Sequence, residues 1–344
     1  EAHRRERQDE STEAAAEAGA VDETGGDETG GAEVGADQDD TGAGDAGYVG
    51  NPREVAQRTM DVTPVAVRSR FEKLHIVSSR ERERYARNYE ALVGEGGEEL
   101  AVLFRMLRRP DAGPTPEFDR DVERELRRWA DHDDHPHLVR VLDWGLDPQP
   151  WLVTMFTGAS LADRDPPAID QAVTDARNLA AATAHLHQHD VVHGGIDPGN
   201  VAYPDRIVAA GDRQPPLLDN VGLLHVYRYH FEPSSLVDPR FAAPEYFERG
   251  YGRIDHLTDV YHLGAVIYLL FTGDPPYTGS RSEIREQVTT GPPPHPGDAA
   301  DAVPPEIDDV VAKAMATRKL RRYESVEHMR QELAAIDGGE ADGH

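Results

Sequence analysis

The sequence predicts an α+β protein in which a small antiparallel sheet comes first and a larger helical lobe follows. Two observations support this fold class. Short apolar segments separated by glycine-containing or polar turns dominate the chain up to about residue 157. Long segments with a helical spacing of apolar residues dominate the chain after that point. A sheet built from one half and helices from the other is typical of the α+β class.

Four segments in the first half predict strands. Tyr89–Val93 and Leu100–Leu107 are largely apolar and are joined by the turn Gly94-Glu95-Gly96-Gly97. Leu138–Trp144 and Trp151–Phe156 are two further apolar segments. We expect these four strands to form the sheet of the N-terminal lobe.

Three segments predict helices. Phe118–Ala130 is charged and amphipathic, and it carries Leu126 and Trp129 on one apolar stripe. Ile169–His187 is long and rich in alanine. Val260–Phe271 is apolar on almost every side, which indicates a helix buried within a large helical lobe.

Composition divides the chain into four regions. Residues 1–50 are rich in Glu, Asp, Gly, Ala and Thr, so we expect a disordered acidic tail there or, alternatively, an interaction arm. Order is expected to begin near Val62. We assign residues 51–157 to the N-terminal lobe, 158–336 to the C-terminal lobe and 337–344 to a second disordered tail. The first residue is Glu1 rather than Met, which is compatible with a fragment of a longer protein.

The charge and composition exclude several classes of function. The chain has 64 acidic and 36 basic residues and a net charge of -28, and this field repels phosphate backbones, so we expect no nucleic-acid partner. An acid excess with few lysines is typical of salt-adapted proteins, in which charge repulsion is screened over ~3 Å at 1 M salt. The absence of cysteine excludes disulfides and cysteine zinc sites. We find no apolar run of ~20 residues and no secretory signal, so we expect a cytoplasmic location and no membrane contact within this chain.

Six short motifs follow one another between Phe71 and Ile336. They are His135-Pro136-His137-Leu138-Val139, Trp151-Leu152-Val153-Thr154-Met155, Val192-His193-Gly194-Gly195-Ile196-Asp197-Pro198-Gly199-Asn200, Ala243-Pro244-Glu245, Asp259-Val260-Tyr261-His262-Leu263-Gly264 and Arg322-Tyr323. In this order and spacing they resemble landmarks of the eukaryotic-type Ser/Thr protein kinases, although any one of them alone would be weak evidence. The resemblance implies the bilobal protein-kinase fold.

The family binds ATP with a glycine-rich loop, because only glycine lets backbone N–H groups approach phosphate oxygens closely. The corresponding stretch here, Arg80–Ala86, contains no glycine. Glu81 and Glu83 fall where two of the glycines would lie, and their carboxylates would repel a triphosphate. We interpret this stretch as a solvated pair of strands with alternating charges.

If a nucleotide binds, the resemblance implies five contacting residues. Arg105 stands where the family has a lysine that holds two phosphates, and Glu125 of the following helix is its expected partner. A planar guanidinium is not equivalent to a compact ammonium at such a geometric site. Thr154 is the expected gatekeeper, Met155 leads to the hinge between the lobes, and Asn220 falls in the metal-binding motif.

The catalytic loop has lost the groups that the family uses for chemistry. Gly195 stands at the position of the catalytic aspartate, which accepts the proton of the substrate hydroxyl. Gly194 replaces the preceding arginine, and Asp197 replaces a lysine and so reverses the charge. Asn200, a magnesium ligand in the family, is retained. We therefore expect no intact catalytic group and treat Gly195, Asp197 and Asn200 as degenerate positions.

The metal-binding motif is also altered, and two registers are open. The better register places Asn220-Val221-Gly222 at the D-F-G motif, where an uncharged amide is a poor main ligand for Mg²⁺. A slip by one residue, with a local bulge, places Asp219 there instead. Asn200, Asp219 and Asn220 thus form at best a weak metal site.

The residues that stabilise the C-terminal lobe of the family are retained. By resemblance, Asp259 accepts hydrogen bonds from the backbone of the loop around His193, and Glu245 pairs with Arg322. We expect His193 to pack in the core rather than to act as an acid or a base.

These losses lead to three functional hypotheses. The leading one is a catalytically inactive pseudokinase that uses no cofactor and acts as a scaffold or allosteric regulator of a protein partner, either a kinase or another signalling protein. The first alternative is an active or weakly active Ser/Thr kinase that uses ATP and Mg²⁺, in which Asp197 or Asp219 supplies the missing carboxylate and Asn200 holds the metal. The second alternative is a sensor that binds a small ligand in the cleft between the lobes.

Overall fold

The computed structural model describes residues 69–336 except 80–83, 96–97, 111–112, 114, 205–213, 232–235 and 301. The expected tails at 1–50 and 337–344, the expected onset of order at Val62, and the side chains of Glu81 and Glu83 lie outside the described residues.

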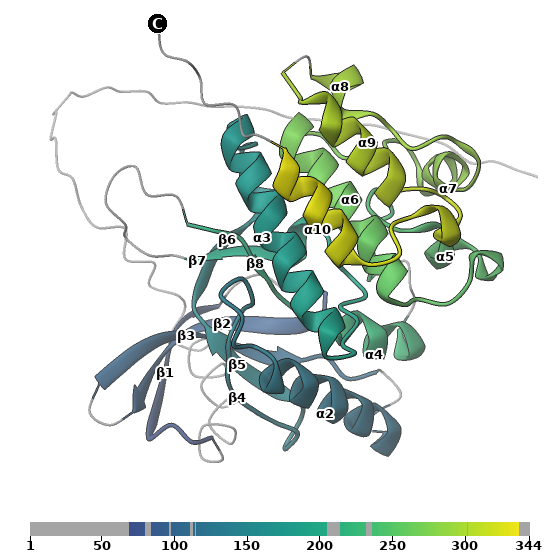
Figure 1. Ribbon diagram of the computed structural model, residues 1–344. Helices are drawn as coiled ribbons and strands as arrows, with labels where there is room; N and C mark the ends of the chain where they lie inside the picture. The colour runs from purple at the N-terminus through teal and green to yellow at the C-terminus, as the bar shows by residue number, and fades with distance from the viewer. Residues whose placement is uncertain are drawn as a thin grey trace, which may run out of the picture. The chain divides into compact units, whose positions relative to one another are not determined.

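A five-stranded antiparallel sheet forms the N-terminal lobe, with the strand order β1-β2-β3-β5-β4 (Figure 1). Its strands are β1 Lys73–Ser79, β2 Ala86–Glu95, β3 Glu98–Leu107, β4 Val141–Gly145 and β5 Trp151–Met155. The four predicted strands are present. The sequence analysis missed β1, because none of its residues is fully buried and the segment therefore carries little apolar signal.

The first part of the predicted strand Leu138–Trp144 connects the two lobes instead of joining the sheet. Leu138 forms a bridge to Leu218 in β8, Leu217–Leu218, of the C-terminal lobe. The N–H of Val139 donates to the carbonyl of Leu218 at 2.9 Å, and the N–H of Leu218 donates to the carbonyl of His137 at 2.9 Å. The backbone of this segment is satisfied by β8, so strand β4 begins only at Val141.

The register of the sheet decides which side chains face the C-terminal lobe. Arg105 in β3 lies opposite Asn88 in β2 and Leu152 in β5. Side chains alternate between the two faces of a strand, so Phe104 and Met106 point to the other face. That outer face forms a small separate core, made of Phe71, Tyr89, Ala91, Val93, Val102, Phe104, Met106, Trp151 and Val153. Arg105 therefore faces the C-terminal lobe.

Helix α2, Pro116–Asp131, covers the predicted helix Phe118–Ala130. It begins at Thr115, whose hydroxyl accepts a hydrogen bond from the N–H of Phe118 at 3.2 Å, and proline occupies its first turn. Its buried face carries Trp129, whose indole N–H donates to the carbonyl of Val139 at 2.9 Å. This contact ties the helix to the segment that connects the lobes.

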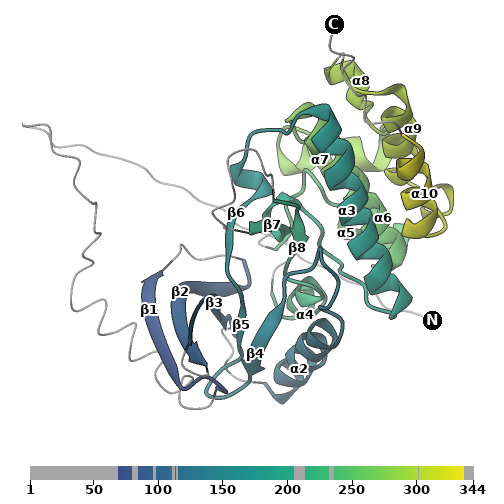
Figure 2. The ribbon, with the colours of Figure 1, turned by 60° about the vertical axis from the view of Figure 1, so that its left-hand side comes forward.

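The C-terminal lobe is mainly helical, and the same arrangement is seen from a second side in Figure 2. Its helices are α3 Ile169–Gln188, α4 Leu223–His230, α5 Pro244–Phe247, α6 His256–Thr272, α7 Arg281–Thr290, α8 Pro296–Ala299, α9 Pro305–Ala314 and α10 Val326–Ala335, with short 3-10 turns at Leu161–Asp163, Pro198–Asn200, Arg249–Tyr251 and Lys319–Arg321. A second small sheet contains β6 Thr157–Ser160, β7 Val201–Pro204 and β8. Helix α6, which contains the predicted buried helix, contacts α3, α9 and α10.

No helix in the described part of the chain is both long enough and apolar enough to cross a bilayer.

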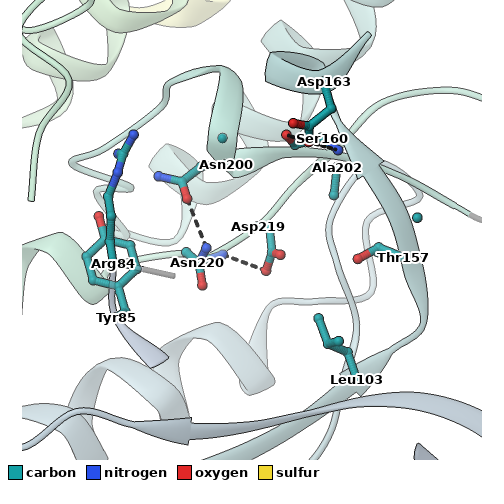
Figure 3. A pocket seen from close by; sticks show the side chains of 12 residues that line it. Arg84, Tyr85, Leu103, Thr157, Ser160, Asp163, Asn200, Ala202, Asp219 and Asn220 are labelled. Carbon is teal, nitrogen blue, oxygen red and sulfur yellow. Dashed lines mark hydrogen bonds between the residues drawn. The ribbon is translucent and has the colours of Figure 1, made fainter. Parts of the chain in front are cut away.

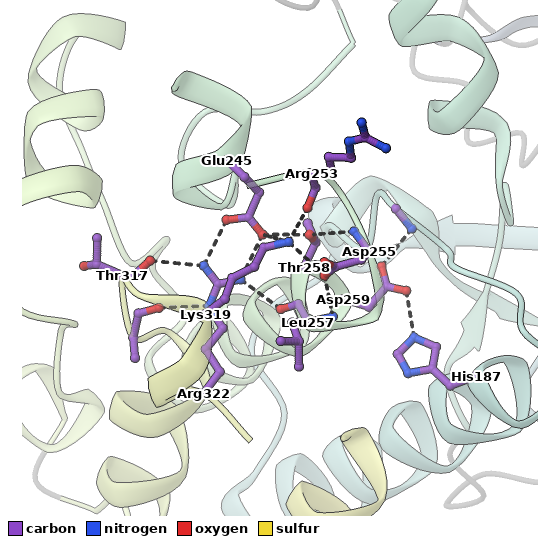
Figure 4. Close-up of polar contacts among 12 residues, drawn as sticks. His187, Glu245, Arg253, Asp255, Leu257, Thr258, Asp259, Thr317, Lys319 and Arg322 are labelled. Carbon is purple, nitrogen blue, oxygen red and sulfur yellow. Dashed lines mark hydrogen bonds and ion pairs between the residues drawn. The ribbon is translucent and has the colours of Figure 1, made fainter. Parts of the chain in front are cut away.

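A buried ion pair fixes the base of the C-terminal lobe (Figure 4). Two guanidinium nitrogens of Arg322 donate to the two carboxylate oxygens of Glu245, each at 2.9 Å, and both side chains are 0% exposed. The hydroxyl of Thr258 donates to Glu245 at 2.6 Å, and Lys319 lies 3.4 Å from the same oxygen. Because both carboxylate oxygens of Glu245 accept hydrogen bonds from Arg322, the charged pair is tolerated in the interior.

A second buried carboxylate holds the loop that would be catalytic. Asp259 accepts hydrogen bonds from the N–H of His193 at 2.8 Å and from the N–H of Gly194 at 2.7 Å. It also contacts Nε2 of His187 at 2.9 Å (Figure 4). Burial opposes ionisation of Asp259, but the contact with His187 outweighs it and holds the pKa of the carboxyl below its usual range.

We expect Glu245→Gln to lower the free energy of unfolding by about 3–5 kcal/mol, because it leaves the charge of Arg322 buried without its partner. Chemical denaturation at neutral pH measures this change. The control is Glu248→Gln, since Glu248 and its partner Arg285 are 40% and 56% exposed. Loss of this surface pair should cost less than about 1 kcal/mol. Equal losses in the two variants would contradict the assignment.

The same ion pair predicts a pH dependence. Burial opposes ionisation of Glu245, but Arg322, Thr258 and Lys319 together outweigh it and lower its pKa below the ordinary value of 4.5. A carboxyl with a depressed pKa stabilises the fold above its unfolded-state pKa, and this stabilisation is lost as the pH falls through the folded-state pKa. The parent should therefore lose stability more steeply below about pH 4.5 than Glu245→Gln does. Denaturation curves recorded between neutral and acidic pH test this, and parallel curves would refute it.

Candidate functional site

A polar cavity of about 340 Å³ lies between the sheet and the loop Val192–Asn200 (Figure 3). Leu103 of β3 faces the cavity from the side of the sheet, and Asn200, Asp219 and Asn220 face it from the opposite side. Arg84 and Tyr85 lie at one end of the cavity, and Thr157, Ser160 and Asp163 lie at the other end. The remaining lining residues are Gly158, Gly199 and Ala202. The structure thus brings Asn200, Asp219 and Asn220 to one cavity.

Arg105 makes the strongest polar contacts beside this cavity. Its NH2 group donates to one carboxylate oxygen of Asp219 at 2.6 Å, and its NH1 group donates to the other at 2.9 Å. NH1 also donates to the side-chain oxygen of Asn220 at 2.8 Å. Arg105 is only 1% exposed and does not line the cavity. The carboxylate nearest to the expected metal position is therefore already neutralised by a guanidinium fork.

The two asparagines of the expected metal site bind each other. The side-chain N–H₂ of Asn220 donates to the side-chain oxygen of Asn200 at 2.9 Å (Figure 3). Asn200 in turn donates to the carbonyl of Gly195 at 2.7 Å. Asn220 has a φ of 58°, a left-handed conformation that asparagine adopts more readily than most residues. This conformation turns Asn220 toward Asn200, while the preceding Asp219 turns toward Arg105.

The residues present do not fit a magnesium ion that carries a triphosphate. Magnesium needs near-octahedral oxygen ligands with at least one carboxylate. Asp219 is the buried carboxylate nearest the asparagines, and both of its oxygens accept from Arg105. Among the described residues, no cluster of three or more His, Asp or Glu side chains has a metal-binding arrangement. Two registers of the metal-binding motif were open, one with Asp219 and one with Asn220 at the position of the metal ligand. In either register the side chain at this position accepts a hydrogen bond from Arg105.

Gly195, at the position where the family has its catalytic aspartate, packs against helix α4. Gly195 lies against Leu224 of α4, and its N–H donates to Nδ1 of His193 at 3.3 Å. Asp197 begins the turn Pro198–Asn200, accepts from the N–H of Asn200 at 3.1 Å, and forms an ion pair with Arg84. Neither Gly195 nor Asp197 thus presents a free carboxylate to the cavity.

His193 has a structural environment. Its Nδ1 accepts from Gly195, so its proton is on Nε2, which donates to the carbonyl of Asp219 at 2.9 Å. Burial lowers the pKa of His193, although Asp259 opposes this effect. The neutral ring is fully buried and links the loop to the segment that carries Asp219.

Of the other three expected contacts of a nucleotide, Glu125 and Thr154 are buried and Met155 is partly buried. Glu125, the expected partner of Arg105, accepts instead from Nε of Arg124 at 2.9 Å and from Arg128 at 3.4 Å, and it is 3% exposed. Thr154 lies opposite Leu103 across the β3–β5 pair and is fully buried. Met155 ends β5 and is partly buried.

Two residues that close this site lie in the stretch Arg80–Ala86, and the expectation that this stretch is solvated is wrong for Tyr85 and Ala86, each of which is 3% exposed. Arg84 and Tyr85 line the cavity, and Tyr227 of α4 contacts the backbone of Tyr85. Burial raises the pKa of Tyr85, although the charge of Arg84 opposes the effect, so its phenol stays neutral. A signal was available, because two consecutive glycines at Gly194 and Gly195 indicate a close approach of another segment.

Comparison with known proteins gives one family. A family model described as protein tyrosine and serine/threonine kinase matches residues 86–333. The chain is 32% identical over 259 residues to the DNA damage-responsive serine/threonine-protein kinase RqkA of Deinococcus radiodurans, over 68% of this chain and 37% of that protein. It is 27% identical over 282 residues to the serine/threonine-protein kinase PknB of Mycolicibacterium smegmatis, over 73% of this chain and 43% of that protein. The chain thus spans about two-fifths of the length of these relatives.

The fold has solved counterparts. The kinase domain of PknI from Mycobacterium tuberculosis superposes with a TM-score of 0.56 at 22% identity, over 77% of this chain and 96% of that domain. This likeness confirms the predicted arrangement of a sheet lobe followed by a helical lobe.

We expect Arg105→Met to lower the free energy of unfolding by about 3–5 kcal/mol, because Asp219 would remain buried without its cation. The double variant Arg105→Met/Asp219→Asn removes both charges and should recover part of this loss. Arg127→Met is the control, since Arg127 pairs with Glu123 on the exposed side of α2 and should cost less than about 0.5 kcal/mol. Chemical denaturation measures all three. Additive losses in the double variant would show that the pair is not coupled.

Proposed function

The chain belongs to the protein tyrosine and serine/threonine kinase family, and from that premise we propose that it is a pseudokinase domain. In this proposal the cleft transfers no phosphoryl group. The domain acts instead as a scaffold or allosteric regulator of a protein partner, such as a kinase or another signalling protein. The observation that carries the proposal is the contact of Arg105 with Asp219 and Asn220.

Phosphoryl transfer needs metal ions that bridge the phosphates and a residue that takes the proton of the acceptor hydroxyl. A divalent cation at Asp219 would have to compete with the guanidinium of Arg105, which is buried and forms two hydrogen bonds to that carboxylate. Separation of a buried pair leaves an uncompensated charge and is strongly unfavourable. Electrostatics therefore favour the metal-free arrangement.

The proton acceptor is missing as well. Gly195 carries no acceptor group, and the carboxylate of Asp197 is bound by Arg84 and by the N–H of Asn200. For the active-kinase alternative, either Asp197 would have to leave both contacts or Asp219 would have to leave Arg105. Either rearrangement disfavours a relocated catalytic site.

A specific observation supports the small-ligand sensor as second candidate. The cavity of about 340 Å³ has the size of a small-molecule site, and its lining is rich in hydroxyl and amide groups. Such a lining suits a small polar ligand better than a metal-bound triphosphate. In this candidate the ligand would replace the nucleotide as the regulator of the domain.

We expect Mg²⁺–ATP to leave the thermal midpoint of the chain unchanged, because no metal site is available to it. A nucleotide present at 100 times its Kd would add about 2.7 kcal/mol of stability, which a thermal shift assay detects. The measurement is best made at high salt because of the net charge of -28. Radiolabelled phosphate transfer from ATP to the chain or to a generic protein substrate would refute the proposal.

We expect the variant Gly195→Asp/Asn220→Asp to transfer no phosphate either. The new carboxylate at position 195 would meet Leu224, and the cation of Arg105 would bind the new carboxylate at position 220. The same radiolabel assay tests this outcome, with the parent chain as the reference. Restored transfer would show that the two missing carboxylates were the whole cause of inactivity.

A further inference from the structure

Helix α4 is seated on the loop where the catalytic aspartate would be. A Cβ atom added to Gly195 would lie 3.0 Å from Cδ2 and 3.2 Å from Cβ of Leu224. These distances are tighter than ordinary carbon contacts, so a side chain at position 195 would push Leu224 away. The absence of a side chain at Gly195 therefore creates the space that Leu224 fills.

The neighbouring glycine extends this seat. Gly194 has a φ of 73°, which favours glycine, and an added Cβ would lie 3.0 Å from Nδ1 of His225. Burial, with the positive charge of Arg228, lowers the pKa of His225 to about 4, so the ring is neutral at physiological pH. Two consecutive side chains of α4 thus lie on two consecutive glycines.

Tyr227, one turn after Leu224 in α4, contacts the N-terminal lobe. The hydroxyl of Tyr227 lies 2.7 Å from the carbonyl oxygen of Tyr85 and 2.9 Å from that of Arg108. Tyr85 precedes β2 and Arg108 follows β3, so a single hydroxyl joins the two ends of this hairpin. The ring of Tyr227 also packs edge-on against Tyr85 at 5.1 Å and against Phe118 of α2 at 5.7 Å. All three aromatic rings are buried.

A second contact anchors the same segment. Arg84, directly before Tyr85, forms an ion pair with Asp197 of the loop and donates to the carbonyl of Leu236 at 3.4 Å. Arg108 donates to the carbonyl of Arg84 at 2.9 Å. The start of β2 is therefore bound to the C-terminal lobe both directly and through α4.

We propose that α4 is a latch that holds the two lobes together, and that Gly194 and Gly195 form the seat into which it closes. In this proposal the glycine at position 195, where the family has its catalytic aspartate, is also what makes room for α4. Release of α4 from its seat weakens the contact between the lobes, because Tyr227 is shared between them, while Arg105 and Arg84 keep their own contacts with the C-terminal lobe. Tyr229, on the outward side of the same helix, is 70% exposed and is the part of the latch that a partner can reach.

Two variants weaken the latch, one at its contact with the N-terminal lobe and the other at its contact with Gly195. Each variant has a matched control. Tyr227→Phe removes the hydroxyl that joins Tyr85 and Arg108, and Gly195→Ala places a methyl group against Leu224. The control for the first is Tyr251→Phe, which removes a hydroxyl that donates to the carbonyl of Thr289 at 3.1 Å in the C-terminal lobe. The control for the second is Gly250→Ala, whose new methyl group meets no atom within 4 Å.

Hydrogen exchange of the apo chain, with no nucleotide, measures the latch independently of any phosphoryl transfer. We expect amide exchange in Leu223–His230 to be roughly tenfold faster in Tyr227→Phe and in Gly195→Ala, the effect of losing one hydrogen bond or one close packing contact. Unchanged exchange in α4 for both single variants, or equal acceleration by the controls, would overturn the proposal.

A distance measurement between the lobes tests release itself. The chain has no cysteine, so spin labels attach only at the introduced positions His75→Cys in β1 and Ala335→Cys in α10, both exposed. We expect one distance population in the parent and a second one, or clear broadening, in Tyr227→Phe. Identical distributions in parent and variant would show that α4 is only part of a fixed core.

Discussion

The ion pair between Arg105 and Asp219 is the interaction on which the cleft depends. It joins β3 of the N-terminal lobe to the segment that precedes α4 in the C-terminal lobe, with distances of 2.6 and 2.9 Å and almost no exposure of the guanidinium. A buried pair of this kind is stable only if both charges stay and their other hydrogen-bonding groups are satisfied. The N–H of Asn220 donates to Asp219 at 2.7 Å, and the amide oxygen of Asn220 accepts from Arg105. The three side chains therefore form one hydrogen-bonded unit that joins the two lobes.

The three departures from the kinase pattern, at positions 105, 220 and 195, each add contacts within the protein around this ion pair. An arginine can reach two acceptors at once, whereas the lysine of the family is a single point charge. A neutral asparagine at position 220 can donate to Asn200, which a carboxylate could not do. A glycine at position 195 leaves room for Leu224 and so for α4. Reversal of one of these changes leaves the other two in place, and the cleft would still favour protein contacts over a metal-bound nucleotide.

Much of the fold could be predicted from the sequence, because apolar periodicity reports burial directly. Tyr89–Val93 and Val260–Phe271 are examples, since each has a strong apolar pattern and both lie in buried elements. The segment after Leu138 could not be placed, because its backbone pairs with Leu218, some 80 residues later in the chain. Helix α4 was not predicted, because it too depends on contacts with distant parts of the chain. Its sequence from Leu223 to His230 is short and rich in tyrosine and histidine, so its helical structure depends on packing between the lobes rather than on propensity. The identities of the site positions followed from motifs, but the contact of Arg105 with Asp219 did not, because it depends on distances that only the fold sets.

The scaffold of the C-terminal lobe is held independently of the side chains that the family uses for chemistry. Asp259 holds the backbone N–H groups of His193 and Gly194, and its contacts involve no atom of a substrate or a metal. In the family this scaffold presents an aspartate at the next position. Here it presents Gly195, and the loop that would have oriented a reacting hydroxyl supports Leu224 instead. Asp259 holds the backbone of the loop and not its side chains. A substitution at position 195 therefore changes the side chain that the loop presents, while the contacts of Asp259 with the loop stay in place. The same architecture can thus position either a catalytic group or a structural helix, and in this chain the buried charges of Arg105 and Asp219 favour the helix.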